Sequence, residues 1–437
     1  MSFPRYPEYK DSGVEWLGEV PGHWEVRRIG SLFHEVNEAG DEALPILCVS
    51  IHDGVSDREL DENEMERKVS RSEDRSKYKK VLPGDLVYNM MRAWQGGFGA
   101  VAVDGMVSPA YVVARPRESV PTFLVEQLLR TPNAVEEMRR HSRGITDFRL
   151  RLYWGEFKEI AVTLPPAHER TAISAFLERE TAKIDALVAE QQRLIELLKE
   201  KRQAVISHVV TKGLNPDAPM KDSGIEWFGE VPAHWTPKLI KFDLDLVTSG
   251  SRGWAQFFSD DGDLFFRITN IQREHLEPDL SEPQHVTPPE GAEGERSRIR
   301  PGDILISITA DLGSVTVAPE GLAGAYVSQH VCLARPGINL CPRWAGYALK
   351  ADCSKVQFEA SGYGGTKIQL SLGDVRNVQV ALPPLPEQET IAAYLDAECG
   401  RFDTLTAEAQ RSIDLLQERR TTLISAAVTG QIDIRAA

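Results

Sequence analysis

A run of 42 residues without glycine or proline, 169–210, is the feature that most constrains what this chain can fold into. Apolar side chains recur along it at steps of three and four residues, which places them on one face of an α-helix. They are Ile173, Leu177, Ile184, Leu187, Leu194, Leu198, Val205 and Val209. Such a helix would be about 60 Å long, far beyond a usual globular helix. It cannot bury its apolar face alone, so the run predicts a partner helix.

The chain repeats this segment 218 residues later. Residues 164–214 align without a gap to 382–432, and more than two fifths of the aligned positions are identical, including the Leu-Pro-Pro that precedes each run. Two similar long helices, each apolar on one face, are expected to pack on each other as a coiled coil. Two unconnected bundle helices are the simpler alternative. The residues expected in the pairing are Ile184, Leu187, Leu194, Leu198, Val205, Phe402, Leu405, Leu416 and Leu423.

Bulk properties exclude several classes of protein. At 437 residues the chain has room for two or more domains. The N-terminus lacks an apolar signal segment, and no apolar run approaches 18 residues, so no membrane association is expected. Five cysteines without a CxxC pair suit a reducing, cytoplasmic compartment and argue against a disulfide framework or a zinc site.

The charge balance is acidic overall but locally reversed. A net charge of −15 argues against a free-standing nucleic-acid binder. Basic side chains nevertheless crowd the stretches 67–80 and 139–151. An acidic chain with basic faces suits a protein that shares its DNA with more basic subunits, while solvated surface charge is the simpler interpretation of either cluster.

Each half of the chain opens on the same phrase. Lys10–Gly30 and Lys221–Lys241 share Lys-Asp-Ser-Gly-(Val/Ile)-Glu-Trp and a Pro-x-His-Trp turn. The aromatic residues are expected to hold each N-terminal segment onto its module, which makes His23 and His234 structural rather than catalytic. Two Pro-Gly-Asp turns, at 83–85 and 301–303, each precede a buried strand.

Between these landmarks the two modules read as mixed α/β. Strands are expected at Leu44–Ile51, Asp85–Met90, Gly99–Val103, Val107–Ala114, Glu159–Leu164, Leu264–Thr269, Asp303–Ile308, Val327–Ala334 and Val378–Leu382, and helices at Pro121–Arg130, Pro132–Arg140 and Pro342–Phe358. The predicted fold class is α+β, with two globular modules joined by two paired long helices in an internal pseudo-two-fold repeat. The predicted divisions are module one at 1–165, helix at 166–212, linker at 213–220, module two at 221–383, helix at 384–430 and tail at 431–437.

A search for catalytic motifs finds no persuasive site. The sequence has no GxxxxGK[ST] loop, no HExxH and no Cys/His set with metal spacing, so no cofactor and no metal are expected. The best alternative is a single-chain nuclease or methyltransferase that uses Asp147, Glu156 and Lys158, but this spacing arises often by chance. A coiled-coil scaffold that binds only proteins leaves unexplained why the modules diverge while the helices stay alike. The prediction is therefore a non-catalytic chain.

Recognition loops remain, and they differ between the modules. Arg, Gln and Asn side chains can form paired hydrogen bonds to base edges, and ordinary surface loops are the simpler interpretation of any one position. The DNA-binding candidates are Asn89, Arg92, Trp94, Gln95, Arg143, Arg149 and Arg151 in the first module, and Ser307, Thr309, Ser328, Gln329, His330, Lys367 and Gln369 in the second.

The doubled opening phrase, the Pro-Gly-Asp turns and the two Leu-Pro-Pro-to-helix segments together resemble the specificity subunit of type I restriction-modification systems. The resemblance covers nearly the whole chain. It implies that residues 88–116 and 302–336 belong to two different classes of target recognition domain, each reading one half of a split DNA site. It also implies that the long helices pair antiparallel and carry methyltransferase subunits.

The partners implied by this resemblance are double-stranded DNA, two copies of the methyltransferase subunit, and a restriction subunit with nuclease and ATPase activity. No methyl-donor, nucleotide or nuclease site is implied in this chain, in agreement with the motif search. His168, where the family commonly has Pro or Glu, and His208-Val209, where the second copy has Ala426-Ala427, are small departures that concern packing.

Overall fold

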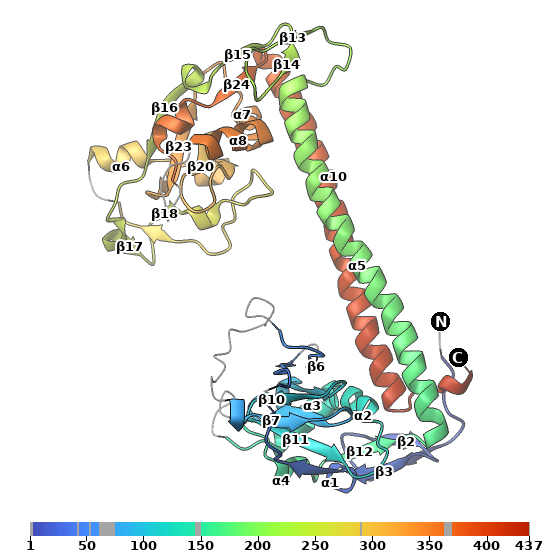
Figure 1. Cartoon of the computed structure of the whole chain (residues 1–437). Helices are drawn as coiled ribbons and strands as arrows, with labels where there is room; N and C mark the ends of the chain where they lie inside the picture. The colour runs from blue at the N-terminus through green and yellow to red at the C-terminus, as the bar shows by residue number, and fades with distance from the viewer. Residues whose placement is uncertain are drawn as a thin grey trace. The chain divides into compact units, whose positions relative to one another are not determined.

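The computed structural model describes residues 3–41, 43–51, 54–60, 75–144, 150–288, 291–361 and 369–436. The chain divides into two compact units, of which unit 1 comprises Met1–Glu190 and Ser412–Ala437, and unit 2 comprises Gln191–Arg411. Helix α5 (Ala167–Lys212) and helix α10 (Leu385–Val428) each contribute one part of their length to each unit (Figure 1). Among the described residues no helix is long and apolar enough to cross a membrane.

The globular part of unit 1 is built on a four-stranded antiparallel sheet. Its order is β4 (Phe33–Val36), β11 (Tyr111–Pro116), β8 (Leu86–Asn89) and β9 (Phe98–Ala100). Helices α2 (Thr122–Leu129) and α3 (Pro132–His141) follow the sheet, and their apolar side chains join its main core. The other elements are α1 (Ile29–Leu32), β5 (Val49–Ser50), β6 (Gly54–Val55), η1 (Arg75–Lys77), β7 (Lys79–Val81), η2 (Ala93–Gln95), β10 (Gly105–Val107) and α4 (Trp154–Phe157).

Short antiparallel pairs connect the sheet of unit 1 to α5. Strand β1 (Tyr9–Asp11) pairs with β2 (Glu19–Pro21), and β3 (Glu25–Arg28) pairs with β12 (Ala161–Leu164), which leads directly into α5. Of the strand predicted over Leu44–Ile51, the structure has only β5 at Val49–Ser50 and an isolated parallel bridge between Ile46 and Met106. Pro45 has no backbone N–H to donate to a ladder, and the amide of Ile46 instead bonds the Glu59 carboxylate at 3.2 Å.

Unit 2 repeats the sheet and then adds to it. The antiparallel sheet β16 (Leu244–Ser249), β23 (Val331–Pro336), β20 (Ile304–Ser307) and β21 (Val315–Val317) has the same order of connection as that of unit 1. A second sheet joins β17 (Phe258–Ser259), β19 (His285–Val286), β18 (Asp263–Phe266) and β22 (Tyr326–Val327), and its β18–β22 pair is parallel. The modules therefore share a frame and differ in what is attached to it.

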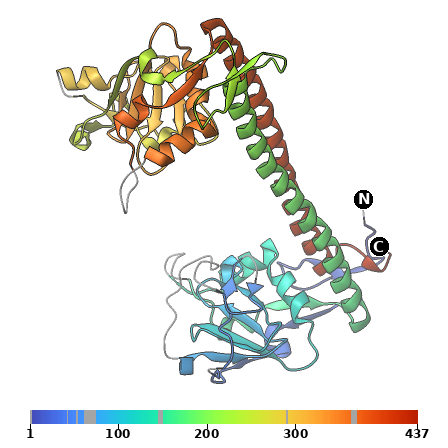
Figure 2. The ribbon, with the colours of Figure 1, turned by 45° about the horizontal axis from the view of Figure 1, so that its top comes forward.

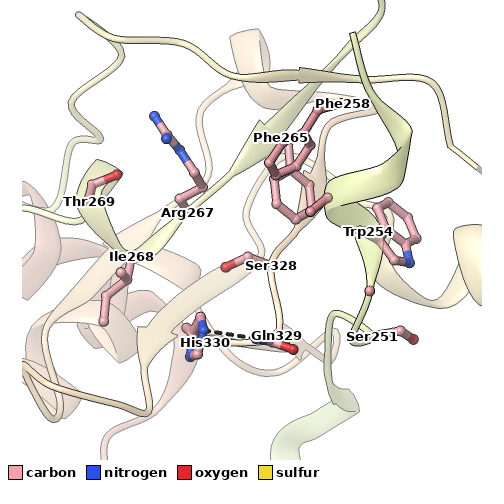
Figure 3. Close-up of a pocket in the computed structure, with 12 residues that line it drawn as sticks. Ser251, Trp254, Phe258, Phe265, Arg267, Ile268, Thr269, Ser328, Gln329 and His330 are labelled. Atoms are coloured by element: carbon pink, nitrogen blue, oxygen red, sulfur yellow. Dashed lines mark hydrogen bonds between the residues drawn. The ribbon is translucent and has the colours of Figure 1, made fainter.

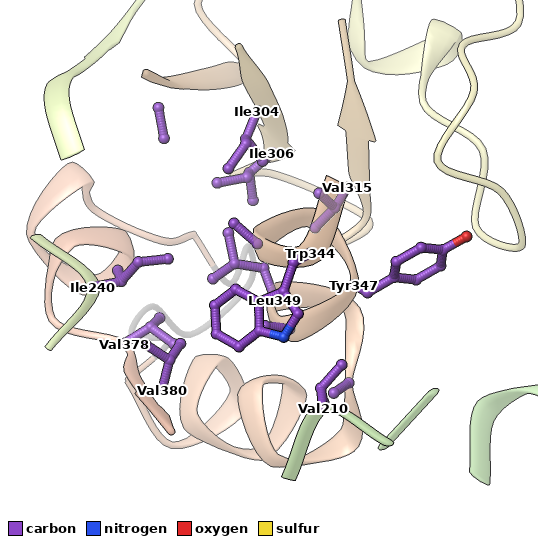
Figure 4. Close-up of a cluster of buried hydrophobic side chains, with 14 of the residues drawn as sticks. Val210, Ile240, Ile304, Ile306, Val315, Trp344, Tyr347, Leu349, Val378 and Val380 are labelled. Carbon is purple, nitrogen blue, oxygen red and sulfur yellow. The ribbon is translucent and has the colours of Figure 1, made fainter. Parts of the chain in front are cut away.

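The remaining elements of unit 2 surround these two sheets. They are β13 (Met220–Asp222), β14 (Glu230–Pro232), β15 (Thr236–Leu239), η4 (Ile240–Asp243), η5 (Trp254–Phe257), η6 (Ile268–Asn270), α6 (Ala292–Ser297), η7 (Glu320–Leu322), α7 (Pro342–Lys350), α8 (Asp352–Ser361), α9 (Leu372–Arg376) and β24 (Gln379–Leu382). Its core packs Trp344 and Leu349 of α7 against the sheet, with Val210 of α5 and Val378 and Val380 from the other side (Figure 4).

The helix predicted over Pro342–Phe358 is interrupted at Ala351, which has an extended backbone. Tertiary contacts hold the start of α8 at this point. The amide of Asp352 donates to Ser207 Oγ at 2.9 Å, while its carboxylate accepts from Ser207 at 2.9 Å and from Gln203 at 2.8 Å. These contacts are tertiary, so the sequence around Ala351 gives no local sign of the break.

An ion pair recurs at the same place in both modules. Asp85, after the first Pro-Gly-Asp turn, is buried and accepts two hydrogen bonds of 3.1 Å from Arg115. Asp303 is buried and bonded to Arg335 in the same way, at 2.8 and 2.7 Å. Each aspartate also accepts a backbone amide three residues earlier, at Leu82 and Arg300 respectively. The turns are therefore locked to the strand that crosses the middle of each sheet.

Helices α5 and α10 lie side by side in both views (Figures 1 and 2). In unit 1, Arg420 Nε donates to Asp185 at 2.9 Å, and in unit 2 Arg202 Nη1 donates to Asp403 at 2.6 Å. The later residue of α5 thus meets the earlier residue of α10. Each contact is local to its own unit, and each has the direction expected of antiparallel helices.

The shielded positions of the two helices follow alternating steps of four and three residues. On α5 they include Ile184, Val188, Gln191, Ile195, Leu198, Arg202 and Val205, and on α10 Phe402, Thr406, Ala409, Ile413, Leu416, Arg420 and Leu423. The prediction was wrong for Leu187, Leu194 and Leu405, which are 46%, 42% and 47% exposed. A repeat of 3.5 residues turns Val188, Ile195 and Thr406 inward instead of their neighbours.

The two ends of the chain meet at the start of α5 in unit 1. Glu169 is buried, and its carboxylate accepts hydrogen bonds from Trp24 Nε1 at 3.0 Å and Tyr6 Oη at 3.0 Å, and contacts His23 Nε2 at 2.6 Å. Arg435 of η8 (Ile434–Ala436) lies 3.5 Å from the same carboxylate. His23 is therefore part of a structural cluster, as predicted. In unit 2 His234 contacts Glu387 at 2.7 Å, but both side chains are more open to solvent.

Candidate nucleic-acid interface

The first candidate loop follows β8 and is held by its own backbone. Asn89 Oδ1 accepts from the amide of Met91 at 3.0 Å, and Trp94 Nε1 donates to Met91 O at 3.2 Å. Gly96 has φ +91° and ends η2, a conformation that L side chains rarely adopt. Asn89, Arg92 and Trp94 are half-buried while Gln95 is exposed. Asn89 and Trp94 thus serve partly to hold the conformation of the loop.

The second candidate loop lies beside the first. Arg143 and Arg151 exchange backbone hydrogen bonds of 2.9 Å, and the next amide, of Leu152, donates to Met90 O at 2.9 Å. The two loops are therefore neighbours, although some 50 residues separate them in the sequence. Arg143 is 73% exposed and ion-pairs with Glu156. Arg149 lies outside the described residues.

The pairing of Glu156 bears on the nuclease alternative. Its carboxylate is engaged by Arg143, and Asp147 lies outside the described residues. Within the described ranges no group of three or more His, Cys, Asp or Glu side chains could hold a metal ion.

In the second module the candidates form one chain of hydrogen bonds. Thr309 Oγ1 bonds His330 Nδ1 at 3.2 Å, and the other ring nitrogen, Nε2, bonds Gln329 Nε2 at 3.0 Å. The backbone of Thr309 also bridges to Gln369. His330 and Gln369 are exposed, and Thr309 and Gln329 are half-buried. The structure thus brings four candidates together, and Lys367 lies outside the described residues.

Two candidates of the second module are buried instead of facing solvent. Ser307 is fully buried and its hydroxyl donates to Thr309 O at 2.9 Å, while Ser328 is 6% exposed. The expected role as a direct DNA contact is therefore wrong for Ser307, whereas Ser328 is buried but lines a pocket. Ser307 ends β20 and its hydroxyl holds the loop that follows, while Ser328 comes directly after β22.

The loop after β20 contains backbone strain. Ala310, with φ +59°, is the one non-glycine with a positive φ among the described residues. Next to it, Asp311 pairs with Arg273 at 2.8 Å and accepts from Ser314 Oγ at 2.5 Å. Strained backbone of this kind persists where the surroundings fix the conformation, and it clusters at functional sites.

This strain gives a direct prediction for stability. Replacing Ala310 by glycine should raise the free energy of unfolding by about 1 kcal/mol, because glycine adopts this φ without the clash of a Cβ. Chemical denaturation of the two proteins measures the difference. Ala323→Gly, at an exposed position of ordinary φ in the same unit, is the control and should lower stability. If both variants lose the same free energy of unfolding, the backbone at Ala310 is not strained.

Comparison with known proteins finds similar chains in one family. A model described as the type I restriction modification DNA specificity domain matches residues 293–413. The putative type I restriction enzyme MjaX specificity subunit of Methanocaldococcus jannaschii is 22% identical over 459 residues, covering 96% of each chain. The type I restriction enzyme EcoBI specificity subunit of Escherichia coli is 21% identical over 282 residues, which are 63% of this chain and 59% of that one. The chain is thus similar to type I specificity subunits over nearly its whole length.

Solved structures agree with this chain in fold. A solved chain from a study of "complex assembly and conformational transition of the type I R-M system" matches with a TM-score of 0.70 at 19% identity, covering 94% of the present chain and 98% of the solved one. The HsdS subunit from Thermoanaerobacter tengcongensis matches with a TM-score of 0.52 at 20% identity and the same coverage. The family resemblance found in the sequence and the expectation of a non-catalytic chain are both confirmed.

Proposed function

We propose that the globular modules of units 1 and 2 are two target recognition domains, each of which reads one half of a split, asymmetric DNA sequence. The domains span about 1–165 and 221–383, followed by spacer helices at 166–212 and 384–430, with a linker at 213–220 and a tail at 431–437. The observation that carries the proposal is one sheet topology used twice with unlike loops at corresponding strand ends. The shared sheet topology would place both modules on DNA in the same way, and the different loops would recognise different half-site sequences.

The paired helices act in this proposal as an antiparallel coiled coil that sets the distance between the half-sites. The four-three spacing of the shielded positions supports it, because this repeat keeps one seam facing the partner helix. Antiparallel pairing of two similar helices also gives a pseudo-two-fold, which offers two equivalent docking positions. Two methyltransferase subunits would occupy them, and a restriction subunit with nuclease and ATPase activity would join the complex.

Reconstitution tests this assignment. The chain is co-expressed with the methyltransferase of its own system, the complex is purified, and its mass and its binding to a library of random duplexes are measured. We expect two methyltransferase copies for each chain and selection of a motif with two fixed parts around an unspecified gap. Because the chain is acidic, the isolated subunit should bind DNA weakly, with partners supplying much of the phosphate contact. Selection of one continuous motif would contradict the proposal.

Single substitutions should separate the two half-sites. Arg92→Ala or Gln95→Ala should weaken or relax one half-site only, by about 1–3 kcal/mol for each lost paired contact to a base. Arg149→Ala is expected to act on the same half-site. Gln329→Ala, in the other module, is the matched control and should affect the other half-site. Binding to duplexes with one altered half-site at a time measures each effect. If Arg92 and Gln329 variants lose the same half-site, the assignment of modules to half-sites is wrong.

A further inference from the structure

Unit 2 contains a pocket of about 300 Å³ beside the proposed DNA-contacting loop. It lies between η5, β18 and the turn at residues 328–330 (Figure 3). Ligand pockets in proteins start at about this size. All of its lining residues lie between Ser251 and His330. The pocket is thus a feature of the second module, on the segment that this module adds to the shared frame.

One wall of the pocket is aromatic. Trp254 and Phe265 stack with their ring centroids 5.8 Å apart and their planes at 22°, and Phe258 packs on Phe265 at 5.3 Å. Trp254 and Phe265 are buried, whereas Phe258 is 42% exposed and stands at the rim. Flat aromatic surfaces of this kind bind planar rings by stacking, and they do so with little preference among the bases. The sequence signal was the group of aromatic residues at 254–266, which the search for polar loops passed over.

The opposite edge of the pocket is polar. Gln329 and His330 line it and are bonded to each other at 3.0 Å, with Thr309 holding the far side of the imidazole. Ser328 also lines the pocket, and its buried hydroxyl has no hydrogen-bond partner within the described part of the chain. Arg267 donates to Glu282 O at 3.0 Å, but its Nε is likewise buried without a partner among those residues. Buried polar atoms normally find partners, so the unpaired hydroxyl points to an absent ligand.

We infer that this pocket receives a single nucleobase rotated out of the DNA duplex at the second half-site. A base offers what the pocket combines, namely a flat ring for Trp254, Phe258 and Phe265 and a hydrogen-bonding edge for Gln329. Rotation of a base out of the stack into a pocket of stacking side chains is an established way for proteins to reach it. The inference rests on the proposed function, since it needs the second module on DNA. One base of the half-site would then be recognised inside the protein, and the other bases at their edges in the DNA grooves.

The test uses the assembled complex with its methyltransferase subunits and duplexes that carry one abasic position at a time across the second half-site. Phe258→Ala reduces the rim of the pocket, and Ala255→Phe fills it from another lining position. Phe242→Ala is the matched control, because Phe242 is 69% exposed in the same unit and does not line the pocket. Dissociation constants are measured for each protein on each duplex.

We expect one abasic position to weaken binding by the wild type about five- to hundredfold, the range of a lost base stack. For Phe258→Ala and Ala255→Phe, the same abasic position should change the dissociation constant little. For Phe242→Ala, it should change the dissociation constant as much as it does for the wild type. If no position couples to the pocket variants while the wild type still selects a split motif, the pocket inference alone is overturned. Loss of methyltransferase from the Phe258→Ala complex would also overturn it, by assigning the pocket to a protein partner. Failure of the wild type to select any split motif would overturn the proposed function itself.

Discussion

Lengthening both long helices by one heptad should widen the gap between the half-sites by about three base pairs and leave both half-sites unchanged. Duplicating 189–195 in α5 and 407–413 in α10 adds seven residues to each helix and preserves the four-three order of shielded positions. Seven residues add about 10 Å at 1.5 Å per residue, and one base pair rises 3.4 Å. Mapping of methylated sites in cells that carry the variant measures the new gap.

A loss of efficiency should accompany this shift. Three base pairs rotate the second half-site by about a quarter of a turn of DNA, so its groove no longer meets the module at the original angle. The control inserts seven residues into the linker at 213–220, which lengthens a connection without lengthening the helix pair. That variant should keep the original gap. An unchanged gap in the heptad variant, with both half-sites still read, would show that the helices do not set the spacing.

Replacing Glu169 by alanine should cost about 3 kcal/mol or more of stability, the largest effect that we expect from a single side chain. The substitution removes the shared acceptor of Trp24 Nε1 and Tyr6 Oη and leaves both donors inside the protein. Removing one member of a buried charged network carries a penalty of this size because the remaining groups stay desolvated. Thermal and chemical denaturation of the purified chain measures the loss.

The repeat supplies a matched control. Glu387 occupies the equivalent position in α10, but its side chain is 32% exposed and pairs with the half-exposed His234. Glu387→Ala should therefore cost less than about 1 kcal/mol. Comparable losses from the two substitutions would contradict the role of the buried donors at Glu169.

The Glu169 cluster also gives a pH dependence. Burial opposes ionisation of Glu169, but hydrogen bonds from Trp24, His23 and Tyr6 outweigh it and lower the pKa of this carboxyl. A carboxyl with a lower pKa in the folded state stabilises the fold above its unfolded pKa, and this contribution disappears as the pH falls through the folded value. The wild type should therefore lose its advantage over Glu169→Ala in acid. An advantage that is constant across that range would contradict the network.

The long helices could be predicted because their signal is strong and local. In the α5 segment, more than forty residues without glycine or proline leave few alternatives to a helix. The α10 segment repeats it with a single interior glycine, Gly400. It was harder to predict which side chains face the partner helix. Apolar residues at three- and four-residue steps allow either of two adjacent positions to be the one that is buried. Leu187 and Val188 differ by one position, and only the 3.5-residue repeat of the pair selects Val188.

The modules were harder to predict because their strands are short. Strands β4 and β16 were missed, since each is a few residues long and mixes apolar with charged side chains. For the interface, residue type indicated the loops but not their exposure. Ser307 and Ser328 are polar yet buried. The pocket has an aromatic wall, and aromatic residues in a sequence are usually predicted to lie in the hydrophobic core.

The central proposal is that this chain directs methylation to one split DNA sequence. Genome-wide mapping of methylated adenines, in cells with the gene and in cells from which it has been removed, tests the claim most directly. We predict that one motif, made of two short fixed parts and a constant gap, loses its methylation when the gene is removed and regains it when the gene is restored. A methylation map that is the same in both cells would contradict the account.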